Sequence, residues 1–534
     1  MDETASSSLN RANRQIARSA GTVMVAMIFG QLIGLVATSL TGSTFGAGLE
    51  NDAFYAANRF PDILFNLIAG GALASAFIPT FSGLLAQEQR SQAWKLASSI
   101  VNLLLLLLTS IALLSEIFAP QLVRYIIAPG FADSPEKLEL TITLLRIQLP
   151  AAIIFGVSGL LMGILNTHQH FLLPALAPSM YKLGWIFGIL VLSPTMGIIG
   201  LAWGVVIGAA FHLLIQLPSF FRLPQRNYEV MLGWKDATVR EVGRLMAPRL
   251  LGVAAVQLNF WLNTFLASHQ PEGSVAGLNW GFALMIMPQA AIAQSVAIAS
   301  LPMFSRQVAL GKLDEMRSSL VSTLRSVLFL AIPATVGLLM VGRPLVAVIF
   351  ERNAFSTNST DMVSWALFWY STGLIGHCVV EIVSRAFYAL HDTKTPVMIS
   401  VATMSLNYGF SLLFSYLFTQ WGWFPHGGLA LANSLATFLE MLVLLWFMRK
   451  HLAGLQLRWL MTGVGTAGLA ILPMIAGLWI WLQVGSEQSA FLQVAIGVLI
   501  ASALYLLFLL LLKPPEILSI GRILSRRFLH HSEN

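Results

Sequence analysis

The stretch Glu50–Ser82, ENDAFYAANRFPDILFNLIAGGALASAFIPTFS, carries the two features that decide the fold. Its first part is polar and charged, and its second part is an apolar run rich in small residues between Ala69 and Ala76. About 22 residues from Asp62 to Gly83 would form roughly 33 Å of helix, which is enough to cross a hydrocarbon core. Pro61 suits the first turn of such a helix, where its missing N–H costs nothing. The stretch therefore predicts a membrane helix entered through a charged segment.

The composition of the whole chain supports the same class. Of 534 residues, 56% are hydrophobic and only 10% are charged, whereas a soluble protein carries about 25% charged residues. The mean hydropathy is +0.75. A single cysteine, Cys378, excludes an internal disulfide framework and cysteine-based metal sites. The net charge of +7 is spread over connections between apolar runs, so membrane topology explains it better than nucleic-acid binding.

The sequence predicts an all-α polytopic membrane protein with 14 transmembrane helices. Their expected ranges are 19–43, 62–83, 96–118, 141–165, 172–193, 197–219, 247–268, 277–302, 320–342, 362–389, 396–418, 427–448, 459–482 and 490–512. Lysine and arginine gather in alternate connections, which places both termini in the cytoplasm. The first apolar run is too long for a signal peptide and has no clear cleavage site, so we expect a retained helix.

An internal duplication divides most of the chain into two halves. Pro79-Thr80-Phe81-Ser82 recurs as Pro302-Met303-Phe304-Ser305, and further matches follow at nearly the same offset. Parallel repeats of this kind place a substrate cavity near the membrane midplane between two lobes. We therefore expect two pseudo-symmetric six-helix lobes plus two C-terminal helices. The expected domains are an N-lobe at 1–219, a cytoplasmic linker at 220–246, a C-lobe at 247–450, and two helices with a basic cytoplasmic tail at 451–534.

Short motifs point to packing rather than to catalysis. Residues 463–468 match G-x-G-x-x-G, but no strand or suitably spaced acidic residue accompanies them, so a small-residue helix face is the better interpretation. Gly200, Gly204 and Gly208 form a G-x-x-x-G ladder that predicts close helix packing. The sequence contains no P-loop, G-x-S-x-G or H-E-x-x-H motif. We therefore expect a non-enzymatic protein without a cofactor or a metal, whose transport is secondary or uses a partner.

Ionisable residues within or beside apolar spans are the best functional candidates, because they are costly in lipid and usually face a cavity or a partner. Glu381 and Arg385 stand four residues apart, which suits an ion pair. Lys182 and Arg249 have no local partner in sequence and would suit an anionic head group, although snorkelling to the interface is an alternative for Arg249. The full set is Arg59, Asp62, Arg146, Lys182, Arg249, His377, Glu381, Arg385 and Glu440.

Several motifs together resemble the MurJ/MviN lipid II flippase family of the MOP exporter superfamily. The resemblance rests on Phe45-Gly46-Ala47-Gly48 with Asp52-Ala53-Phe54, on Leu144-Leu145-Arg146-Ile147, on Ile164-Leu165-Asn166-Thr167, and on Phe387-Tyr388-Ala389 followed by Asp392-Thr393-Lys394-Thr395-Pro396, among others. Together these motifs cover most of the first twelve expected spans. No single motif is specific, but the set is.

The resemblance implies movement of undecaprenyl-pyrophosphate-linked disaccharide-peptide, lipid II, from the inner to the outer leaflet of the bacterial cytoplasmic (inner) membrane. It implies alternating access between two lobes, a groove for the polyprenyl tail formed by the last two helices, and no catalytic residue. Membrane lipids and cell-wall synthesis proteins are the implied partners. Coupling to the membrane potential, to Na⁺ or to H⁺ is expected.

Family members commonly carry arginines on the first, second and eighth spans, where this sequence aligns Gln31 and Ala37, Phe65 and Asn66, and Ala283. The family's sodium site would fall near Asn263, Asn407 and Ser411, which include no carboxylate. Replacement cations are expected among Arg59, Lys182, Arg249 and Arg385. The candidate cavity residues are therefore Gln31, Asp52, Arg59, Asp62, Asn66, Lys182, Arg249, Glu381 and Arg385.

Two other functions fit the same sequence. A relative that exports another lipid-linked glycan or a small amphipathic compound would explain the uncharged positions on the arginine-bearing spans. A non-transporting scaffold for envelope enzymes would keep the fold without moving its lobes.

Overall fold

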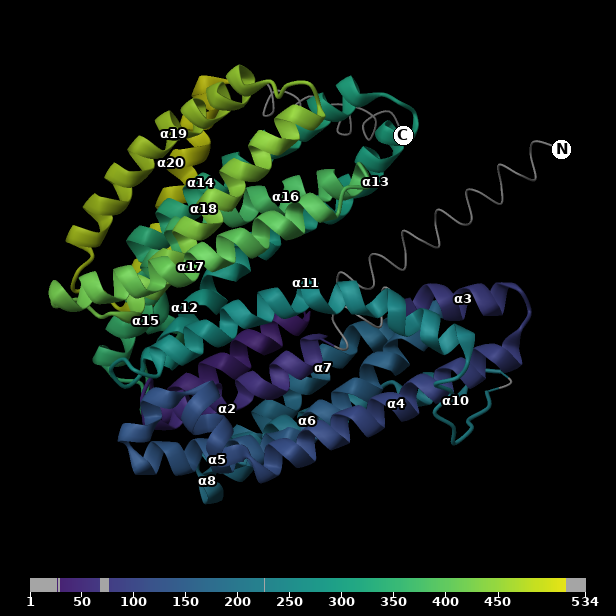
Figure 1. The fold of residues 1–534 in the computed structure, drawn as a ribbon. Helices are drawn as coiled ribbons and strands as arrows, with labels where there is room; N and C mark the ends of the chain where they lie inside the picture. Colours follow the sequence, from purple (N-terminus) through teal and green to yellow (C-terminus); the bar gives the residue numbers. More distant parts are fainter. Residues whose placement is uncertain (1–25, 27–28, 68–75, 225, 515–534) are drawn as a thin grey trace, which may run out of the picture. The chain divides into compact units, whose positions relative to one another are not determined.

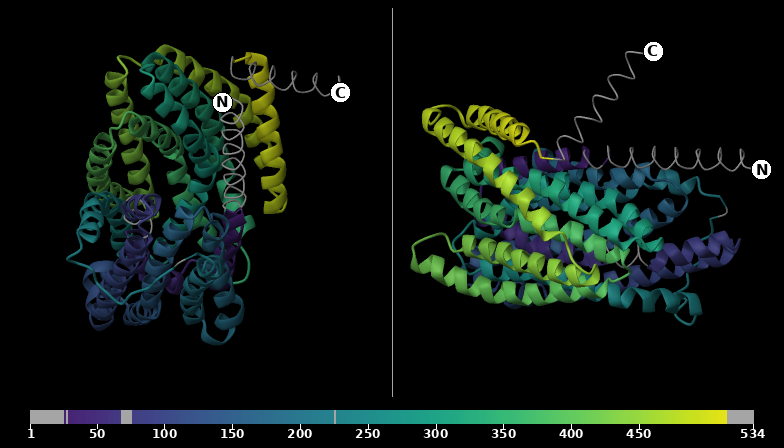
Figure 2. Two further views of the ribbon diagram at one scale, coloured as in Figure 1. Left: turned by 90° about the vertical axis from the view of Figure 1, so that its right-hand side faces the viewer. Right: turned by 90° about the horizontal axis from the view of Figure 1, so that it is seen from above.

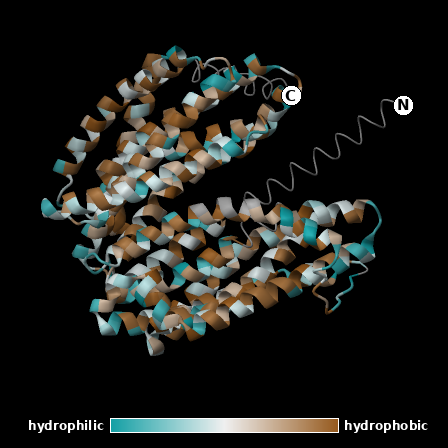
Figure 3. Ribbon diagram, viewed as in Figure 1, coloured by the Kyte–Doolittle hydropathy of each residue, from teal (hydrophilic) through white to brown (hydrophobic). Residues whose placement is uncertain are grey.

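The computed structural model describes residues 26, 29–67, 76–224 and 226–514, and every regular element in these ranges is a helix (Figure 1). Ten helices are long and apolar enough to cross a membrane, and a bent pair of helices brings the number to 11 among the described residues. Hydrophobic residues predominate along the helices, and hydrophilic residues gather at helix ends and connections (Figure 3). The chain is thus a multi-pass, all-helical membrane protein. Parts of the expected spans 19–43 and 62–83 lie outside the described residues.

By their internal contacts, the described residues form two compact units. The first runs to Val275 and includes Arg352–Phe355, and the second comprises Ala276–Glu351 and the chain from Ser356 onward. This division follows contacts, whereas the lobe boundaries expected at 219 and 247 follow the sequence repeat. The helix at 237–267 shows the difference, because the repeat groups most of it with the second half and its contacts place it in the first unit.

The first unit contains helical residues 29–45, followed by helices α2 to α11. Their bounds are α2 Leu49–Phe65, α3 Ile78–Ala86, α4 Arg90–Ile117, α5 Ala119–Gln121, the π-helix η2 Leu122–Ile127, the 3-10 helix η3 Pro129–Asp133, α6 Pro135–Thr167, α7 Leu172–Phe187, the π-helix η4 Gly188–Leu192, α8 Ser193–Met196, α9 Ile198–Leu214, α10 Leu217–Phe221 and α11 Ala237–Ala267. A buried aromatic group of Phe77, Phe81 and Trp94 joins α3 and α4.

The opening stretch folds differently from its prediction. Helix α2 begins at Leu49, so Pro61 lies inside the helix rather than in its first turn, and the charged residues are part of the helix. Two features favour the earlier start. Glu50 and Asp52 occupy the first turn, where carboxylates stabilise the positive end of the helix dipole. Pro61 stands close to the C-terminal end at Phe65, so its missing N–H removes only one late hydrogen bond.

The second unit consists of helices α12 to α20. Their bounds are α12 Ser274–Gln289, the π-helix η5 Ala290–Gln294, α13 Ser295–Ala309, α14 Leu313–Phe350, α15 Thr357–Thr372, α16 Leu374–Ala389, α17 Lys394–Gln420, α18 His426–His451, α19 Leu457–Val484 and α20 Ala490–Leu512. Helix α14 contacts both α19 and α20, which pack side by side and are the yellow pair in Figure 2.

One expected span proved to be broken. The range 362–389 was predicted as a single helix, but α15 and α16 meet at an angle of 47° around Gly373. A Cβ atom on Gly373 would lie 2.8 Å from the Ser434 Cα atom. Glycine therefore allows the backbone of the bend to press against α18.

The connection between α16 and α17 is held by a local hydrogen bond, in which the backbone N–H of Thr395 donates to Asp392 at 3.0 Å. Burial raises the pKa of Asp392, but this contact and the charge of His451 outweigh it and hold the pKa below its usual value.

The glycine ladder does mark close packing, as predicted. Helix α7 carries Gly184 and is followed by Gly188, and both face Gly200, Gly204 and Gly208 of α9. A Cβ atom on Gly204 would lie 2.8 Å from the Gly188 Cα atom and 2.9 Å from the Gly184 carbonyl oxygen. The two backbones are in contact, so no larger residue fits. In the G-x-G-x-x-G motif at 463–468, Gly463 packs against Arg325, while Gly465 and Gly468 have open space around them.

We predict that Gly204→Ala destabilises the first unit by about 1–3 kcal/mol, because overpacking forces α7 and α9 apart. The matched control is Gly465→Ala, which should be neutral or stabilising by up to about 1 kcal/mol through helix propensity. Thermal unfolding of the purified variants in detergent measures both effects. Equal stability of the two variants would contradict the packing described for α7 and α9.

Candidate functional site

A polar stripe runs along one face of α2. It consists of Tyr55, Arg59 and Asp62 of α2 and of Asn66, the residue directly after its C-terminal end, and the spacing of four, three and four residues places them on one side. All four are partly exposed in a helix whose other residues are largely buried. The Asn66 amide donates to the backbone oxygen of Asp62 at 2.8 Å, and Asn58 donates to the Asp62 carboxylate at 2.7 Å. We call these four residues the α2 stripe.

Two cations accompany the Asp62 carboxylate, which lies close enough to Arg59 and Lys182 to attract both. The Arg59 Nε donates to Thr264 Oγ1 of α11 at 3.2 Å, and its guanidinium stands 5.6 Å from the ring centre of Phe260. Lys182, from α7, has its ammonium 4.4 Å from the ring centre of Trp185. The fold thus gathers three sequence candidates, Arg59, Asp62 and Lys182, into one polar group in the first unit.

A second stripe runs along α16 in the second unit. His377, Glu381, Arg385 and Tyr388 follow each other at spacings of four, four and three residues, and all are partly exposed. The expected ion pair is present, with Arg385 Nη2 2.8 Å from Glu381 Oε1. His377 faces Asn433 of α18 at 3.3 Å. We call these four residues the α16 stripe. Like the α2 stripe, it is a row of partly exposed polar groups along one side of a helix.

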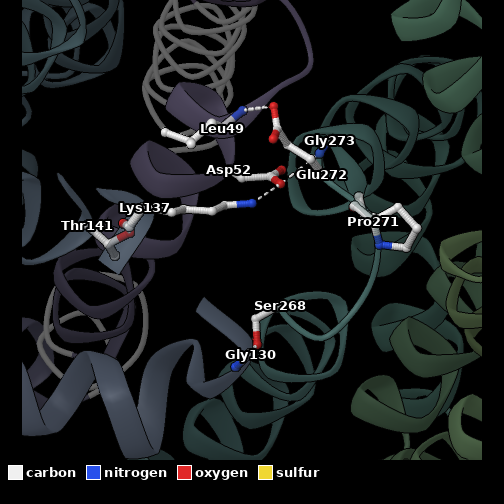
Figure 4. A network of polar contacts seen from close by, with 10 residues as sticks. Leu49, Asp52, Gly130, Lys137, Thr141, Ser268, Pro271, Glu272 and Gly273 are labelled. Carbon is white, nitrogen blue, oxygen red and sulfur yellow. Dashed lines mark hydrogen bonds and ion pairs between the residues drawn. The ribbon is translucent and has the colours of Figure 1, made fainter. Parts of the chain in front are cut away.

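Asp52 lies in a different polar group, which Figure 4 shows. Its carboxylate is 2.7 Å from Lys137 Nζ of α6 and accepts the backbone N–H of Gly273 at 2.8 Å. Only 1% of the Asp52 side chain and 8% of the Lys137 side chain are exposed. Beside it, Glu272 accepts the backbone N–H of Leu49 at 2.7 Å. We call this group the outer polar cluster, because the topology predicted from the lysine and arginine pattern puts its connections outside. Its members are Leu49, Asp52, Lys137, Glu272 and Gly273.

The backbones around the outer polar cluster approach closely. The Gly130 N–H donates to Ser268 Oγ at 3.1 Å, and a Cβ atom on Gly130 would lie 2.3 Å from the Ser268 carbonyl oxygen. The ammonium of Lys137 stands 4.2 Å from the ring centre of Phe131. The cluster therefore holds the start of α2, the start of α6 and the α11–α12 connection together within the first unit.

The remaining candidates are more scattered. Gln31 is exposed on the helix at 29–45, and the side chain of Arg249 lies outside the described residues. Asn263 is buried in α11 of the first unit, whereas Asn407 and Ser411 are buried in α17 of the second. Among the described residues, no group of three or more histidine, cysteine, aspartate or glutamate side chains could hold a metal ion. The sodium site near these three residues stays a prediction.

Sequence reasoning missed Lys137 and Glu272 as functional neighbours of Asp52. Lys137 had one available signal, because it is among the few basic residues in the connections predicted to lie outside. For Glu272 the sequence offered no signal, since 220 residues separate it from Asp52. Ion pairs and hydrogen bonds between distant segments depend on tertiary packing, which neither local spacing nor periodicity reveals.

We predict that Lys137→Ala lowers stability by about 3–5 kcal/mol, because it leaves the buried Asp52 carboxylate without its cation. The matched control is Arg343→Ala, which removes an exposed ion pair with Asp361 and should cost at most about 1 kcal/mol. Adding Asp52→Asn to Lys137→Ala should recover part of the loss. Thermal unfolding in detergent is the measurement. A Lys137→Ala variant as stable as Arg343→Ala would refute the assigned role of the cluster.

Comparison with known proteins gives the family of the chain. The family model described as "Lipid II flippase MurJ" matches residues 41–495. A protein of Vibrio cholerae serotype O1, "Probable lipid II flippase MurJ", is 28% identical over 519 residues, covering 93% of this chain and 97% of the relative. "Lipid II flippase MurJ" of Burkholderia cenocepacia is 29% identical over 475 residues, covering 87% of this chain and 90% of the relative.

Solved structures show the same likeness. "Lipid II flippase MurJ, inward closed conformation" superposes with a TM-score of 0.78 at 25% identity, covering 91% of this chain and 97% of the other. An inward-facing multidrug resistance MATE family transporter of the MOP superfamily shares the fold, with a TM-score of 0.67 at 16% identity and coverage of 81% of this chain and 98% of the other. Since the family model spans most of the sequence, this chain belongs to the MurJ lipid II flippase family.

Proposed function

We propose that this chain is a lipid II flippase, which moves undecaprenyl-pyrophosphate-linked disaccharide-peptide from the inner to the outer leaflet. Family membership over residues 41–495 supports the proposal. The observation that carries it is the α2 stripe, where Arg59, Asp62 and the nearby Lys182 form a polar group in an apolar bundle. Ionised residues in a membrane segment are costly, and they usually mark the path of a polar substrate.

The two stripes suggest how a charged head group crosses the membrane. An isolated pyrophosphate is strongly destabilised in hydrocarbon of about 30 Å thickness. Arg59 and Lys182 on one unit and Arg385 on the other supply cations, while Asp62 and Glu381 limit the net charge so that release stays feasible. Amide and hydroxyl groups of Asn66 and Tyr55 can donate to sugar and phosphate oxygens. No covalent bond changes, so the chain's task is to bind, shelter and release.

We extend the proposal to topology and coupling. The proposed topology has 14 helices in a bacterial inner membrane, with both termini in the cytoplasm. The proposed domains are an N-lobe at 1–219, a linker at 220–246, a C-lobe at 247–450 and two final helices. Rocking of the lobes exposes the substrate to each side in turn. The driving force would be the membrane potential, Na⁺ or H⁺. Partners beyond lipids would be cell-wall synthesis proteins.

The cations give the first test. Combined alanine substitution of Arg59, Lys182, Arg249 and Arg385 should abolish growth of a peptidoglycan-making host in which this gene is the only flippase copy. Lysis with lipid II retained in the inner leaflet is the expected result. The control replaces four exposed cations outside both stripes, Lys95, Arg226, Arg240 and Lys394, and should preserve growth. Normal wall synthesis in the first variant would refute the role given to the cations.

The outer polar cluster gives the second test, because the proposed lobe boundaries put Leu49 in the N-lobe and Glu272 in the C-lobe, so that rocking of these lobes would separate the two residues. A cysteine pair at Leu49 and Glu272, in a Cys378→Ala background, is linked with a short bis-methanethiosulfonate, which forms a reducible disulfide with each cysteine and releases methanesulfinate. We expect the link to stop lipid II movement in vesicles and its reduction to restore it. Each single-cysteine variant treated with the same reagent is the control. Undiminished transport in the linked protein would contradict opening at this point, and no lipid II movement before linking would favour the non-transporting scaffold.

A further inference from the structure

A pocket in the second unit, lined on one side by hydroxyl residues, lies apart from both stripes. Its volume is about 580 Å³, which is within the range of small-molecule sites. Five hydroxyl residues of α14 line it, and Gln456 and Trp459 at the start of α19 and two apolar residues of α13 complete the wall. The hydroxyl residues are Ser318, Ser319, Ser322, Thr323 and Ser326. We call this the hydroxyl pocket.

The hydroxyl pocket presents both hydrogen-bond donors and acceptors. Ser318 Oγ accepts from Gln456 at 3.2 Å and Ser319 Oγ accepts from Gln307 at 2.8 Å, so each hydroxyl proton remains available for a ligand. Thr323 and Ser326 instead donate to helix carbonyls at 2.8 and 3.0 Å, and their oxygens remain available as acceptors. A phosphate offers mainly acceptors, whereas a hydroxyl group both donates and accepts. The pattern therefore suits a ligand with several hydroxyl groups.

The charge and rigidity of the wall favour the same ligand class. All nine described lining residues are uncharged, which suits a neutral group. Trp459 offers an aromatic face, a surface on which the C–H faces of a sugar ring can pack. Behind it, the buried guanidinium of Arg325 stands 4.4 Å from the Trp459 ring centre and donates to the Trp459 backbone oxygen and to Thr462 Oγ1, the latter at 3.1 Å. Arg325 thereby fixes the position of the tryptophan.

The position of the hydroxyl pocket along its helices points to a lipid rather than a solute. Ser318 and Ser326 lie five and thirteen residues into α14 from Leu313, so the row starts about 8 Å from the helix end and extends to about 20 Å. In the sequence topology this end of α14 and the start of α19 are cytoplasmic. Met303 and Val296 of α13 add an apolar wall, against which a lipid chain can lie.

We propose that the hydroxyl pocket binds the polyhydroxyl head group of a membrane lipid, a sugar or a glycerol unit, on the cytoplasmic side. This site goes beyond the flippase function and does not depend on it. Two sources could supply the ligand: a bulk glycolipid or glycerophospholipid, or the disaccharide of lipid II before it reaches the stripes. The chemistry recognised is the same in both.

The test compares two serines in the same local environment. Ser326 is exposed and donates to the Ser322 carbonyl at 3.0 Å, and Ser405 of α17 is exposed and donates to the Val401 carbonyl at 3.0 Å, outside the pocket. Full-length Ser326→Leu and Ser405→Leu are purified in a polyoxyethylene detergent, which carries no sugar. Native mass spectrometry then measures the retention of glucosyl-diacylglycerol, phosphatidylglycerol, lipid II and phosphatidylcholine. Ser322→Ala, which removes a hydroxyl without filling the pocket, guards against misfolding of the leucine variant.

We expect wild type and Ser405→Leu to retain at least one hydroxylated lipid over phosphatidylcholine. Ser326→Leu and Ser322→Ala should weaken that retention roughly tenfold, the effect of losing one or two neutral hydrogen bonds. Selective retention of lipid II alone identifies the substrate as the source, and retention of either diacylglycerol lipid identifies a bulk lipid. Equal retention of phosphatidylcholine, or equal loss in Ser405→Leu, overturns the proposal. These outcomes do not depend on transport.

Discussion

The cost of taking an ionised group out of water governs this structure. The chain limits this cost in two ways. Asp52 and Lys137 are almost fully buried and satisfy each other at 2.7 Å, and the Gly273 N–H adds a further hydrogen bond. Arg59, Asp62, Glu381 and Arg385 instead remain partly exposed on rows of polar residues. The first arrangement stabilises a closed contact, whereas the second leaves polar groups available to a substrate.

This difference links packing to function. The outer polar cluster joins segments that are far apart in the sequence, and close glycine contacts such as Gly130 against Ser268 leave its backbones little freedom. Helices α7 and α9 are similarly tight, because Gly188 and Gly204 allow their backbones to touch. A transporter that rocks needs rigid bundles and a small number of contacts that break. The structure provides tight packing of this kind within the first unit.

The amino-acid sequence predicted the features that arise from local pattern. Apolar length indicated the membrane class, and the spacing of Glu381 and Arg385 predicted an ion pair that the structure contains. The glycine ladder predicted close packing, which α7 and α9 confirm. Prediction failed where tertiary context decided. Pro61 was expected to start a helix but lies near the end of one, and the bend at Gly373 depends on Ser434 of another helix. The partners of Asp52 come from distant segments, so no local signal combined them.

We propose that the lipid II head group travels along the two stripes. Site-specific photo-cross-linking tests it directly, with benzoylphenylalanine in place of Tyr55 on α2, Tyr388 on α16, or the exposed Tyr416 on α17, and lipid II labelled on its peptide. The account predicts labelled adducts at 55 and 388 and background labelling at 416. Labelling at 55 and 388 no stronger than at 416 would contradict it.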